Sequence, residues 1–548
     1  MSLRTLVSSI LVLSLAWCRA HGQWHDDAGP WFIATQGEPW PEPAYRRLLE
    51  QRHCLDLDTF DFKVVNQNCD LLQEALERYE NLMRTEFGFD SSRREPSAAD
   101  EDCKSTISQL RVDLQDASEC AKYPRIDSNE QYQLSIGNNA LAYLSADSIW
   151  GILRGLETFS QLLYRNETQK SIHLRGQEIS DLPRFGHRGL LIDTSRHFLP
   201  VRDILLILDA MAYNKLNVLH WHLVDDNSFP YESLRYPELA QKGAYHPSMI
   251  YRVEDVARVV EHARRRGIRV LPELDTPGHT KSWGRSHPEL LTRCYDAEGR
   301  ATGKLGPMDP SHEPLYDLVE ELLRELGERF PDGQVHLGGD EVLYDCWRSN
   351  PDIRDFMQRR NISLERYELL EEYYVERVLR MARELGLQPV VWQEVFDNGL
   401  RLARSTVVHV WTGDWPREMD AVTRAGHKAL LSACWYLDHV AGGGDWLKYY
   451  RCDPLDFNAT LSQAKQRDLV LGGEACMWGE FVDRNNVHQR VWPRASAAAE
   501  RLWSPKAQDE DTAARRLEEH ACRMNRRGVP AQPPNGSGYC LLPQDYRV

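Results

Sequence analysis

Two carboxylates stand side by side after a pair of glycines, in the segment Gly338-Gly339-Asp340-Glu341. Consecutive side chains of an extended segment point to opposite faces, so these acids are poorly placed to flank one bond as acid and nucleophile. One proton-transferring acid with an acidic helper is the better arrangement. Two acids in a desolvated pocket also push one pKa upward, as a general acid requires. The segment therefore predicts acid–base catalysis by Glu341 beside Asp340.

More acids, cations and aromatic rings follow seven other apolar runs of the chain, each near the C-terminal end of its run. They are Asp193, Arg196, Asp225, His279, Trp392, Trp411, Tyr436, Asp438, Trp478 and Glu480. Structural need alone does not place charges there repeatedly. Carboxylates can transfer protons, and flat rings, among sixteen tryptophans in all, can stack on the C–H faces of a sugar. This combination indicates sugar hydrolysis.

The elements that must position these residues are eight β-rich apolar runs, which alternate with amphipathic segments of helical length from Phe185 onward. The runs cover residues 189–196, 218–225, 268–275, 334–341, 389–395, 406–411, 428–435 and 469–478. Continuous apolar runs are typical of parallel strands that are buried on both faces. Eight of them separated by helices predict an α/β fold, a (β/α)8 barrel, whose active sites lie at the C-terminal ends of the strands.

The chain is predicted to divide into three parts. Residues 1–22 form a signal peptide, because Arg4 precedes an apolar run from Leu6 to Trp17 that is too short to span a bilayer. Residues 23–182 form a smaller α+β domain with one clear helix over 147–164 and an exposed polar loop over 90–102. Residues 183–548 form the barrel with a C-terminal helical extension.

The net charge and the processing signals of the chain indicate its compartment and exclude some classes of partner. A net charge of −16 argues against nucleic acid or an anionic membrane as partner. No segment after the leader approaches the length of a membrane span. Four Asn-x-Ser/Thr sites predict glycosylation, at Asn166, Asn361, Asn458 and Asn535. We expect a glycoprotein of the secretory pathway, lysosomal or extracellular.

Eleven cysteines remain once Cys18 leaves with the leader, and an odd number in an oxidising compartment predicts pairs and one leftover thiol. Candidate pairs are Cys522 with Cys540, Cys434 with Cys452, and Cys294 with Cys346, while Cys54, Cys69, Cys103 and Cys120 are expected to pair among themselves. Cys476, inside an apolar run, is the expected buried free thiol. None of the spacings resembles a zinc site, and no metal or cofactor is predicted.

The motifs together resemble the family 20 glycoside hydrolases, and within them the animal lysosomal β-N-acetylhexosaminidases. The resemblance rests on His187-Arg188-Gly189, Asp193-Thr194-Ser195-Arg196-His197, His220-Trp221-His222-Leu223-Val224-Asp225-Asp226, Asp275-Thr276-Pro277-Gly278-His279, His336-Leu337-Gly338-Gly339-Asp340-Glu341, Trp392-Gln393-Glu394, Trp435-Tyr436-Leu437-Asp438 and the segment from Gly472 to Glu480. It covers the barrel and most of the preceding domain. It implies removal of terminal, non-reducing N-acetylglucosamine or N-acetylgalactosamine with retention of configuration.

The resemblance also implies a role for each matching residue. Glu341 would protonate the leaving oxygen, and Asp340 would orient the 2-acetamido group as its oxygen attacks the anomeric carbon. Tyr436 would hydrogen-bond that oxygen. Trp392, Trp411 and Trp478 would wall the sugar, Arg196, Asp225 and Glu480 would hold its hydroxyls, and His279 with Asp193 would tune Glu341. The resemblance further implies a homodimer.

One pair of residues bears on the choice of substrate. Asp438-His439 resembles the β-type subunits, which prefer neutral sugars, whereas the α-type has Asn followed by Arg at these positions. Sulfated substrates are therefore expected to be cleaved more slowly than neutral ones. Whether the natural substrate is a glycolipid, an N-glycan or a chitin fragment stays open at the level of sequence.

Two other functions remain as alternatives. His220 and His222 put two imidazoles on one strand face, as in metal-dependent amidohydrolases, although the further ligands which those enzymes need after later strands are missing. The other alternative is a sugar-binding protein without turnover. The intact Asp340, Glu341 and Tyr436 argue against it.

Overall fold

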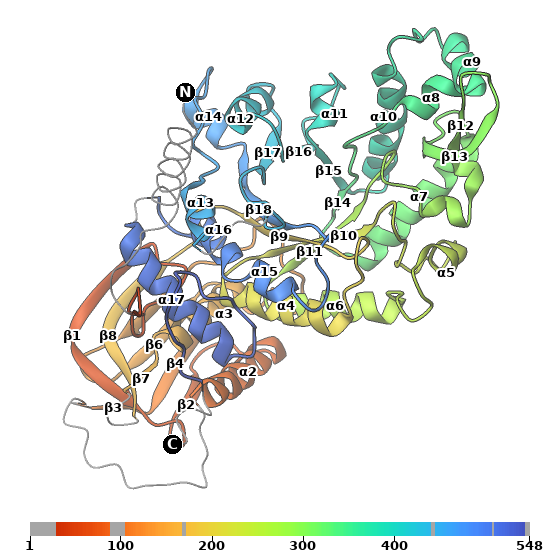
Figure 1. Ribbon diagram of the computed structural model, residues 1–548. Coiled ribbons are helices and arrows are strands. Elements are labelled where there is room, and N and C mark those ends of the chain that lie inside the picture. The colour runs from red at the N-terminus through yellow and green to blue at the C-terminus, as the bar shows by residue number, and fades with distance from the viewer. Residues whose placement is uncertain are drawn as a thin grey trace, which may run out of the picture.

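The computed structural model describes residues 29–87, 103, 105–166, 171–439, 444–506 and 509–542. It consists of a sheet domain and a barrel domain (Figure 1). The predicted signal peptide and the loop predicted over 90–102 lie outside the described residues. Among the described helices, none joins enough length to enough apolar character to cross a lipid bilayer.

Eight parallel strands close into a barrel, which confirms the predicted fold class. They are β9 (His187–Asp193), β10 (Val218–Val224), β11 (Arg269–Leu274), β14 (Gln334–His336), β15 (Gln388–Trp392), β16 (Val407–Val410), β17 (Lys428–Leu431) and β18 (Val470–Met477). Each lies within, or within two residues of, one of the eight apolar runs. The fourth strand is much shorter than its run, because the chain leaves the sheet before the glycine pair.

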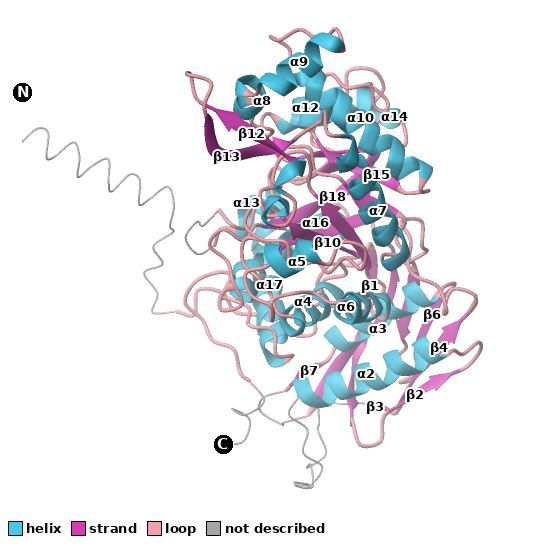
Figure 2. Ribbon diagram, turned by 90° about the vertical axis from the view of Figure 1, so that its right-hand side faces the viewer, coloured by secondary structure: helices cyan, strands magenta, loops and turns pink. Residues whose placement is uncertain are grey.

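Helices follow the strands and cover the outside of the barrel (Figures 1 and 2). The larger ones are α4 (Val201–Tyr213), α6 (Val253–Arg264), α7 (Glu313–Arg329), α10 (Glu368–Glu384), α12 (Trp415–Arg424) and α16 (Arg494–Trp503). In α6 the residues buried against the barrel are Val256, Val259, Val260 and Ala263, one stripe at helical spacing. Shorter elements occupy the loops: α5 (Glu238–Gly243), η1 (Trp283–Arg285), η2 (Pro288–Leu290), α8 (Asp345–Ser349), α9 (Pro351–Arg359), α11 (Glu394–Asp397), α13 (Trp446–Arg451), α14 (Gln463–Arg467) and α15 (Val487–Val491).

The preceding domain is a mixed sheet with two helices, as expected for an α+β fold. Its strands are β1 (Tyr45–Leu55), β2 (Asp61–Val64), β3 (Thr106–Ile107), β4 (Gln109–Leu114), β5 (Tyr132–Ile136), β6 (Ala142–Ala146), β7 (Tyr164–Arg165) and β8 (Ile172–Asp181), in the order β2-β4-β6-β5-β8-β1-β3 with β7 beside β8. Helices α2 (Asp70–Glu86) and α3 (Ile149–Gln161) pack against each other, and α3 also packs on β5 and β6.

Helix α3 joins the two domains. The hydroxyl of Ser148 caps its N-terminus by accepting the N–H of Gly151, and all thirteen of its residues are buried. One side of α3 faces the sheet, while Arg154 donates to the backbone carbonyls of Arg266 and Gly267 in the barrel domain. A helix that is buried all round must pack on both sides, so α3 belongs to the interface as much as to its own domain.

Buried ion pairs cross this interface. Glu130 accepts hydrogen bonds from Arg154 and from Arg188, at 2.8 and 2.7 Å, and all three side chains are almost completely buried. At the C-terminal end, α17 (Glu510–Arg526) contacts α2, and the next residue, Arg527, pairs with Glu86 at 2.7 Å. Because buried charges are costly unless paired, these contacts fix how the domains meet.

Within the described ranges the chain holds five disulfides, and they agree with an oxidising secretory compartment. They join Cys54 to Cys103, Cys69 to Cys120, Cys294 to Cys346, Cys434 to Cys452 and Cys522 to Cys540, and Cys476 is free and buried. The four N-terminal cysteines pair among themselves, and the structure selects one of the connectivities that the sequence left open.

The four predicted glycosylation sites differ in accessibility. Asn361 and Asn458 are exposed and Asn166 is half-buried. The Nδ2 atom of Asn535 donates to the carbonyl of Ala514 and to Glu518. A glycan on that nitrogen would replace one of its two hydrogens and break one of these bonds.

Candidate active site

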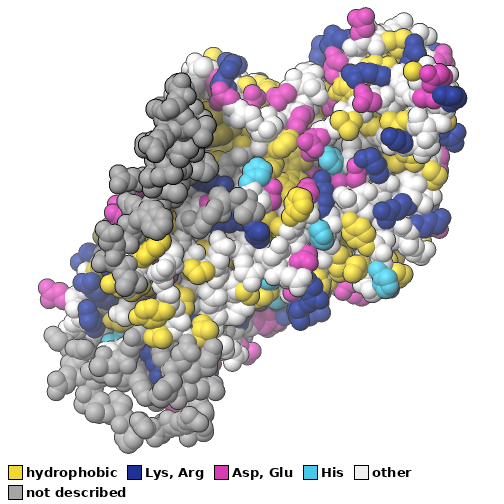
Figure 3. Space-filling model, viewed as in Figure 1, with side chains coloured by type: hydrophobic (Ala, Val, Ile, Leu, Met, Phe, Trp, Pro, Cys, Tyr) yellow, Lys and Arg dark blue, Asp and Glu magenta, His cyan; other side chains and the backbone are white. Residues whose placement is uncertain are grey.

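One pocket opens at the C-terminal ends of the barrel strands. It is lined by Arg196, His279, Asp340, Glu341, Trp392, Trp411, Tyr436, Asp438, His439, Trp478, Glu480, Phe481, Val482 and Arg490. Figure 3 shows a hollow with hydrophobic side chains inside it and acidic side chains and histidines around it. Ten of the twelve predicted catalytic and substrate-binding residues line this pocket, and the other two, Asp193 and Asp225, lie directly behind it.

The glycine pair sets the directions of the two acids. Gly338 and Gly339 have φ angles of +68° and +95°. A Cβ on Gly338 would come 1.7 Å from Asp275 Oδ1, and a Cβ on Gly339 would come 2.4 Å from the side chain of Val395. Only glycine fits both the backbone and the space. The resulting turn sends Asp340 into the buried floor of the pocket and leaves the side chain of Glu341 59% exposed.

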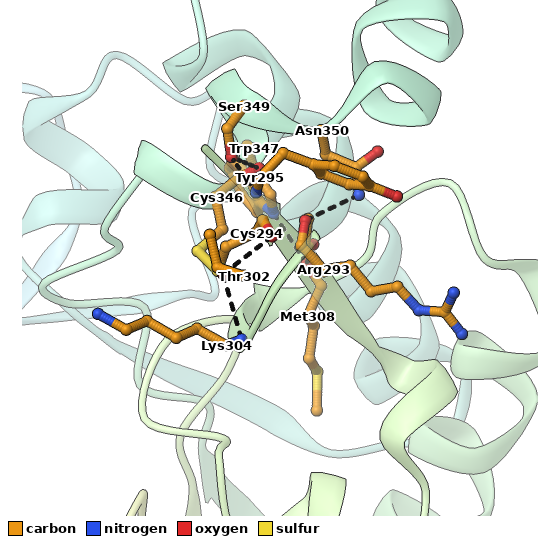
Figure 4. The surroundings of a disulfide bond; sticks show 11 residues. Arg293, Cys294, Tyr295, Thr302, Lys304, Met308, Cys346, Trp347, Ser349 and Asn350 are labelled. Carbon is orange, nitrogen blue, oxygen red and sulfur yellow. Dashed lines mark hydrogen bonds between the residues drawn. A yellow bond between two sulfur atoms is a disulfide. The ribbon is translucent and has the colours of Figure 1, made fainter. Parts of the chain in front are cut away.

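A disulfide-linked hairpin holds the segment after Glu341 (Figure 4). Strands β12 (Leu291–Tyr295) and β13 (Ala301–Met308) form the hairpin, and Cys294 joins it to Cys346 of α8. Trp347 donates to the carbonyl of Met308 at 3.0 Å, and the side chain of Asn350 donates to that of Arg293. This hairpin, which the sequence did not predict, anchors α8 only four residues beyond Glu341.

A histidine of this site is surrounded by carboxylates. His279 Nε2 is 3.5 Å from Glu341 and 3.7 Å from Asp340, and its Nδ1 is 3.2 Å from Asp225. Burial lowers the pKa of His279, but the surrounding carboxylates outweigh it and hold that pKa far above its ordinary value. The contact with His279 in turn lowers the pKa of Glu341.

The carboxyl group with a raised pKa is therefore Asp340, which corrects the expectation for Glu341. Burial raises the pKa of Asp340, and burial together with the charge of Asp340 raises that of Asp275 well above its usual range. Glu341 differs because it is half-exposed and contacts the imidazolium directly. Within the described residues, Asp340 Oδ1 is buried and accepts no hydrogen bond. It is an acceptor that a ligand N–H could fill.

Aromatic rings form the walls. Trp411 stacks on Tyr436 with ring centroids 6.0 Å apart, and Trp392 lies 6.5 Å from Trp411 and 6.1 Å from Trp478. The indole N–H groups fix two of these rings, because Trp392 donates to Glu273 and Trp411 to Glu394 at 2.9 and 2.8 Å. Such an apolar box with fixed rings suits the flat acetamido group and faces of a pyranose.

A cation with three acidic neighbours forms the opposite wall. Arg196 is 2.9 Å from Asp225, 3.2 Å from Asp193 and 3.8 Å from Glu480, and its guanidinium lies 5.1 Å from the ring centroid of Trp478. This network holds Arg196 and leaves the exposed carboxylate of Glu480 available to ligand hydroxyls.

The two acids behind the pocket have contacts that differ from their expected roles. Asp193 was expected to tune Glu341 together with His279, but it accepts the N–H groups of Ser195, Arg196 and Gly479 and a hydrogen bond from the side chain of Arg196. Asp225 was expected to hold sugar hydroxyls, but it is buried, receives the His222 ring, and is the acid that contacts His279.

Several pocket residues were missed by the sequence analysis. Phe481, Val482 and Arg490 line the pocket from the segment after β18. Phe481 is 91% exposed, and Arg490 makes no ion pair within the described part of the chain. No residue pattern distinguishes them from an ordinary loop and helix. Asp275 could have been found, since it follows the third strand as the other site acids follow theirs.

The site and the fold define the class of protein: a barrel with a carboxylic acid pair, a histidine among carboxylates and tryptophan walls at the C-terminal mouth is a glycoside hydrolase domain. Residues 185–506 match the model of the glycosyl hydrolase family 20 catalytic domain, and residues 39–162 match that of a domain described as beta-acetyl hexosaminidase like. The chain belongs to glycosyl hydrolase family 20.

Individual relatives agree with this assignment. The chain is 48% identical over 508 residues to human beta-hexosaminidase subunit beta, covering 91% of this chain and 89% of that one. It is 45% identical over 512 residues to rat beta-hexosaminidase subunit alpha, covering 91% and 94%. Among solved structures, a chitobiase of Flavobacterium johnsoniae matches with a TM-score of 0.77 and 29% identity, over 89% of this chain and 73% of that chain.

Proposed function

We propose that this protein is an exo-acting β-N-acetylhexosaminidase that hydrolyses terminal, non-reducing N-acetylglucosamine or N-acetylgalactosamine residues of glycans, glycolipids or chitooligosaccharides. The observation that carries the proposal is the buried, unpaired Oδ1 of Asp340 on the floor of an aromatic box, beside the exposed Glu341. An acceptor in that place suits the N–H of a 2-acetamido group, which a plain glucoside lacks.

The reaction follows from this placement in two steps. Asp340 accepts the acetamido N–H and turns the acetamido oxygen toward the anomeric carbon, where it forms a C–O bond as the glycosidic C–O bond breaks. Glu341 gives its proton to the leaving oxygen. The acetamido group has then become a cyclic oxazolinium ion, and the Asp340 carboxylate stabilises its positive charge. Tyr436 donates a hydrogen bond to the oxygen of the oxazolinium ring, which is the former acetamido oxygen. Water, deprotonated by Glu341, then opens the ring, so the β configuration is retained.

The His279–Glu341 pair supplies the proton. In the free protein the carboxylates around the His279 ring favour its charged form. A sugar that covers Glu341 removes water from its carboxylate, and desolvation favours the protonated form. The proton passes from His279 to Glu341 once their 3.5 Å contact closes to hydrogen-bonding distance. Asp225 is a positioning residue that keeps the His279 ring turned toward Glu341.

The remaining pocket residues bind the sugar. Arg196, Glu480 and Asp438 offer charged groups to ring hydroxyls, while Trp392, Trp411 and Trp478 contact the acetamido group and the ring faces. Asp193 positions Arg196. The amidohydrolase alternative loses support, because both nitrogens of His222 are hydrogen-bonded to carboxylates, to Glu273 at 2.7 Å and to Asp225 at 2.8 Å.

Substitutions of the acid pair test the mechanism. Glu341→Gln should lose about 10²–10⁴-fold in kcat, with a smaller loss for an aryl leaving group that needs little protonation. Asp340→Asn should lower kcat without creating activity on glucosides. Proton NMR of the first product should show the β anomer. Inverted product, or a covalent sugar ester trapped on any carboxylate, would exclude this route. Binding of N-acetylglucosamine without turnover would favour the sugar-binding alternative.

The resemblance supports three further proposals. We infer a signal peptide over 1–22, domains over 23–182 and 183–548, and a homodimer. Light scattering coupled to gel filtration tests the dimer, and N-terminal sequencing of the secreted protein tests the cleavage site. A monomer at micromolar concentration would contradict the dimer.

A further inference from the structure

Three histidines meet inside the barrel, beneath the floor of the pocket. They are His220 of β10, His336 of β14 and His409 of β16, and the structure leaves all three completely buried. One ring nitrogen from each lies within 4.8 Å of the others. The His409 ring stacks on Trp392 with centroids 4.3 Å apart, so a tryptophan that lines the pocket separates this cluster from the substrate site.

The nitrogens that converge there have no hydrogen-bond partner among the described residues. These atoms are His220 Nε2, His336 Nε2 and both ring nitrogens of His409. Glu273 Oε2 is 2.9 Å from His220 Nε2, but the approach is misaligned for a hydrogen bond. A buried polar atom without a partner is costly, and among the described residues all three rings of this cluster carry a nitrogen that makes no hydrogen bond, which points to a bound species that the protein atoms do not supply.

The outward-facing contacts of two rings fit metal ligation. His220 Nδ1 lies 2.7 Å from Glu474, and His336 Nδ1 lies 3.3 Å from Glu273. A histidine that binds a metal through one nitrogen usually donates its other N–H to a carboxylate or carbonyl oxygen, which fixes the ring and its tautomer. Glu273 and Glu474 are both completely buried, so they also supply two negative charges beside the cluster.

We propose that His220, His336 and His409 bind one divalent transition-metal ion, with zinc as the preferred ion, as a structural site in the barrel core. Three imidazoles are the donor set that zinc favours, with Zn–N distances of about 2.0–2.1 Å. In a tetrahedral site the ligand nitrogens are then about 3.4 Å apart, so the ring nitrogens, which lie within 4.8 Å of one another, must move closer together. Glu273 is near enough to complete the coordination.

Binding would also reach the catalytic segment. His336 Nδ1 now accepts the N–H of Gly338 at 3.1 Å. A metal on Nε2 requires the proton on Nδ1, which would then donate to Glu273 instead. Binding of the ion would therefore break the hydrogen bond from Gly338 N–H to His336 and form one from His336 to Glu273 in the core.

Metal analysis of untagged full-length protein tests the site. After dialysis against zinc and removal of free ion, mass spectrometry of the metal content should find about one zinc per chain. Cobalt in its place should give the visible absorption of a tetrahedral nitrogen-rich site. His409→Gln should lower the zinc content at least tenfold. His488→Gln is the matched control, since His488 is another buried histidine with both nitrogens unpartnered, on α15 and outside the cluster.

The wild-type result decides even if His409→Gln does not fold. Less than a tenth of an ion per chain in folded, zinc-dialysed wild type would overturn the proposal and leave water as the occupant. Zinc that persists in a folded His409→Gln variant would also overturn it, because the ion would then lie elsewhere. His279, Asp340 and Glu341 form one such alternative group. The readout is metal content, so the outcome is independent of glycosidase activity.

Discussion

His279 is surrounded by carboxylates, and this fixes the charge of the free active site. Asp225, Asp340 and Glu341 all lie within 3.7 Å of its ring nitrogens. These carboxylates raise the pKa of the His279 ring, and the ring in turn lowers the pKa of Glu341. His279 can therefore hold the proton next to Glu341, the acid that delivers it. A bound sugar desolvates Glu341, and this favours transfer of the proton to it.

This arrangement predicts a bell-shaped dependence of kcat/KM on pH. Catalysis needs Asp340 ionised, and its pKa is raised from 3.8, so activity should fall on acidification with an apparent pKa above 3.8. It also needs one proton on the His279–Glu341 pair. The pKa of His279 is raised far above 6.5, so the alkaline loss should come well above that value. Rates with a soluble aryl N-acetylglucosaminide between pH 3 and 10 measure both limbs. An alkaline limb at or below pH 6.5 would contradict the assignment.

Arg490 adds a charge that the sequence analysis did not count. Asp438 disfavours a 6-sulfate, as expected, but Arg490 lines the same pocket without an ion pair in the described residues. Arg490→Ala should lower kcat/KM for a 6-sulfated N-acetylglucosaminide about fivefold, the equivalent of about 1 kcal/mol, with little change for the neutral sugar. Arg484→Ala is the control, since Arg484 pairs with Asp203 at 3.7 Å and does not line the pocket. Equal losses for both sugars would show that Arg490 acts only on the fold.

Among the elements, the loop after β17 depends most on cross-links. It carries Tyr436 and Asp438, and Cys434 joins its start to Cys452 at the end of α13. Inside the loop, Tyr449 donates to the carbonyl of Tyr436 at 3.0 Å. Neighbouring Cys476 N–H donates to Trp435, which attaches the loop to β18. The disulfide and these hydrogen bonds hold in place a loop that projects from the barrel and forms one wall of the pocket.

Opening the Cys434–Cys452 disulfide should damage both stability and binding. The Cys434→Ser/Cys452→Ser variant should lose about 3 kcal/mol of unfolding free energy, as the chain-entropy model gives for a loop of this size. Its KM should rise more than its kcat falls, because the loop that bears Asp438 is loosened. Cys522→Ser/Cys540→Ser is a matched control, since both pairs are 18 residues apart in sequence. If the control raises KM equally, the loop has no special role.

For the whole molecule, the domain interface concentrates buried charge at Glu130. Burial raises the pKa of this carboxyl, but Arg188 and Arg154 outweigh burial and lower it overall. Glu130→Ala leaves two buried guanidinium groups without their partner. We expect a loss of about 3–5 kcal/mol in unfolding free energy, measured by urea denaturation. Glu178→Ala removes an exposed partner of Arg47 and should cost less than about 1 kcal/mol. A Glu130 variant as stable as the Glu178 variant would refute the proposed importance of the interface.

The sequence predicted the barrel because its strands are continuous apolar runs. It predicted most of the pocket because the acidic, cationic and aromatic residues follow the C-terminal ends of those strands. It could not predict contacts set by three-dimensional packing. Whether Asp193 or Asp225 reaches His279 depends on side-chain directions within a turn. Phe481 and Arg490 lie beyond the last strand, where no repeated pattern exists. The pKa order of Asp340 and Glu341 depends on burial, which adjacency in sequence does not reveal.

His279 and Glu341 have φ angles of +54° and +50°, a region that residues other than glycine occupy at a cost of about 1–2 kcal/mol each. The backbone is therefore strained at the two residues whose side chains handle the proton. Directed evolution for heat tolerance alone would select glycine at these positions, because glycine relieves the backbone strain. Every such variant would have lost a side chain that catalysis needs. A screen for hardier variants of this protein should score turnover in every round.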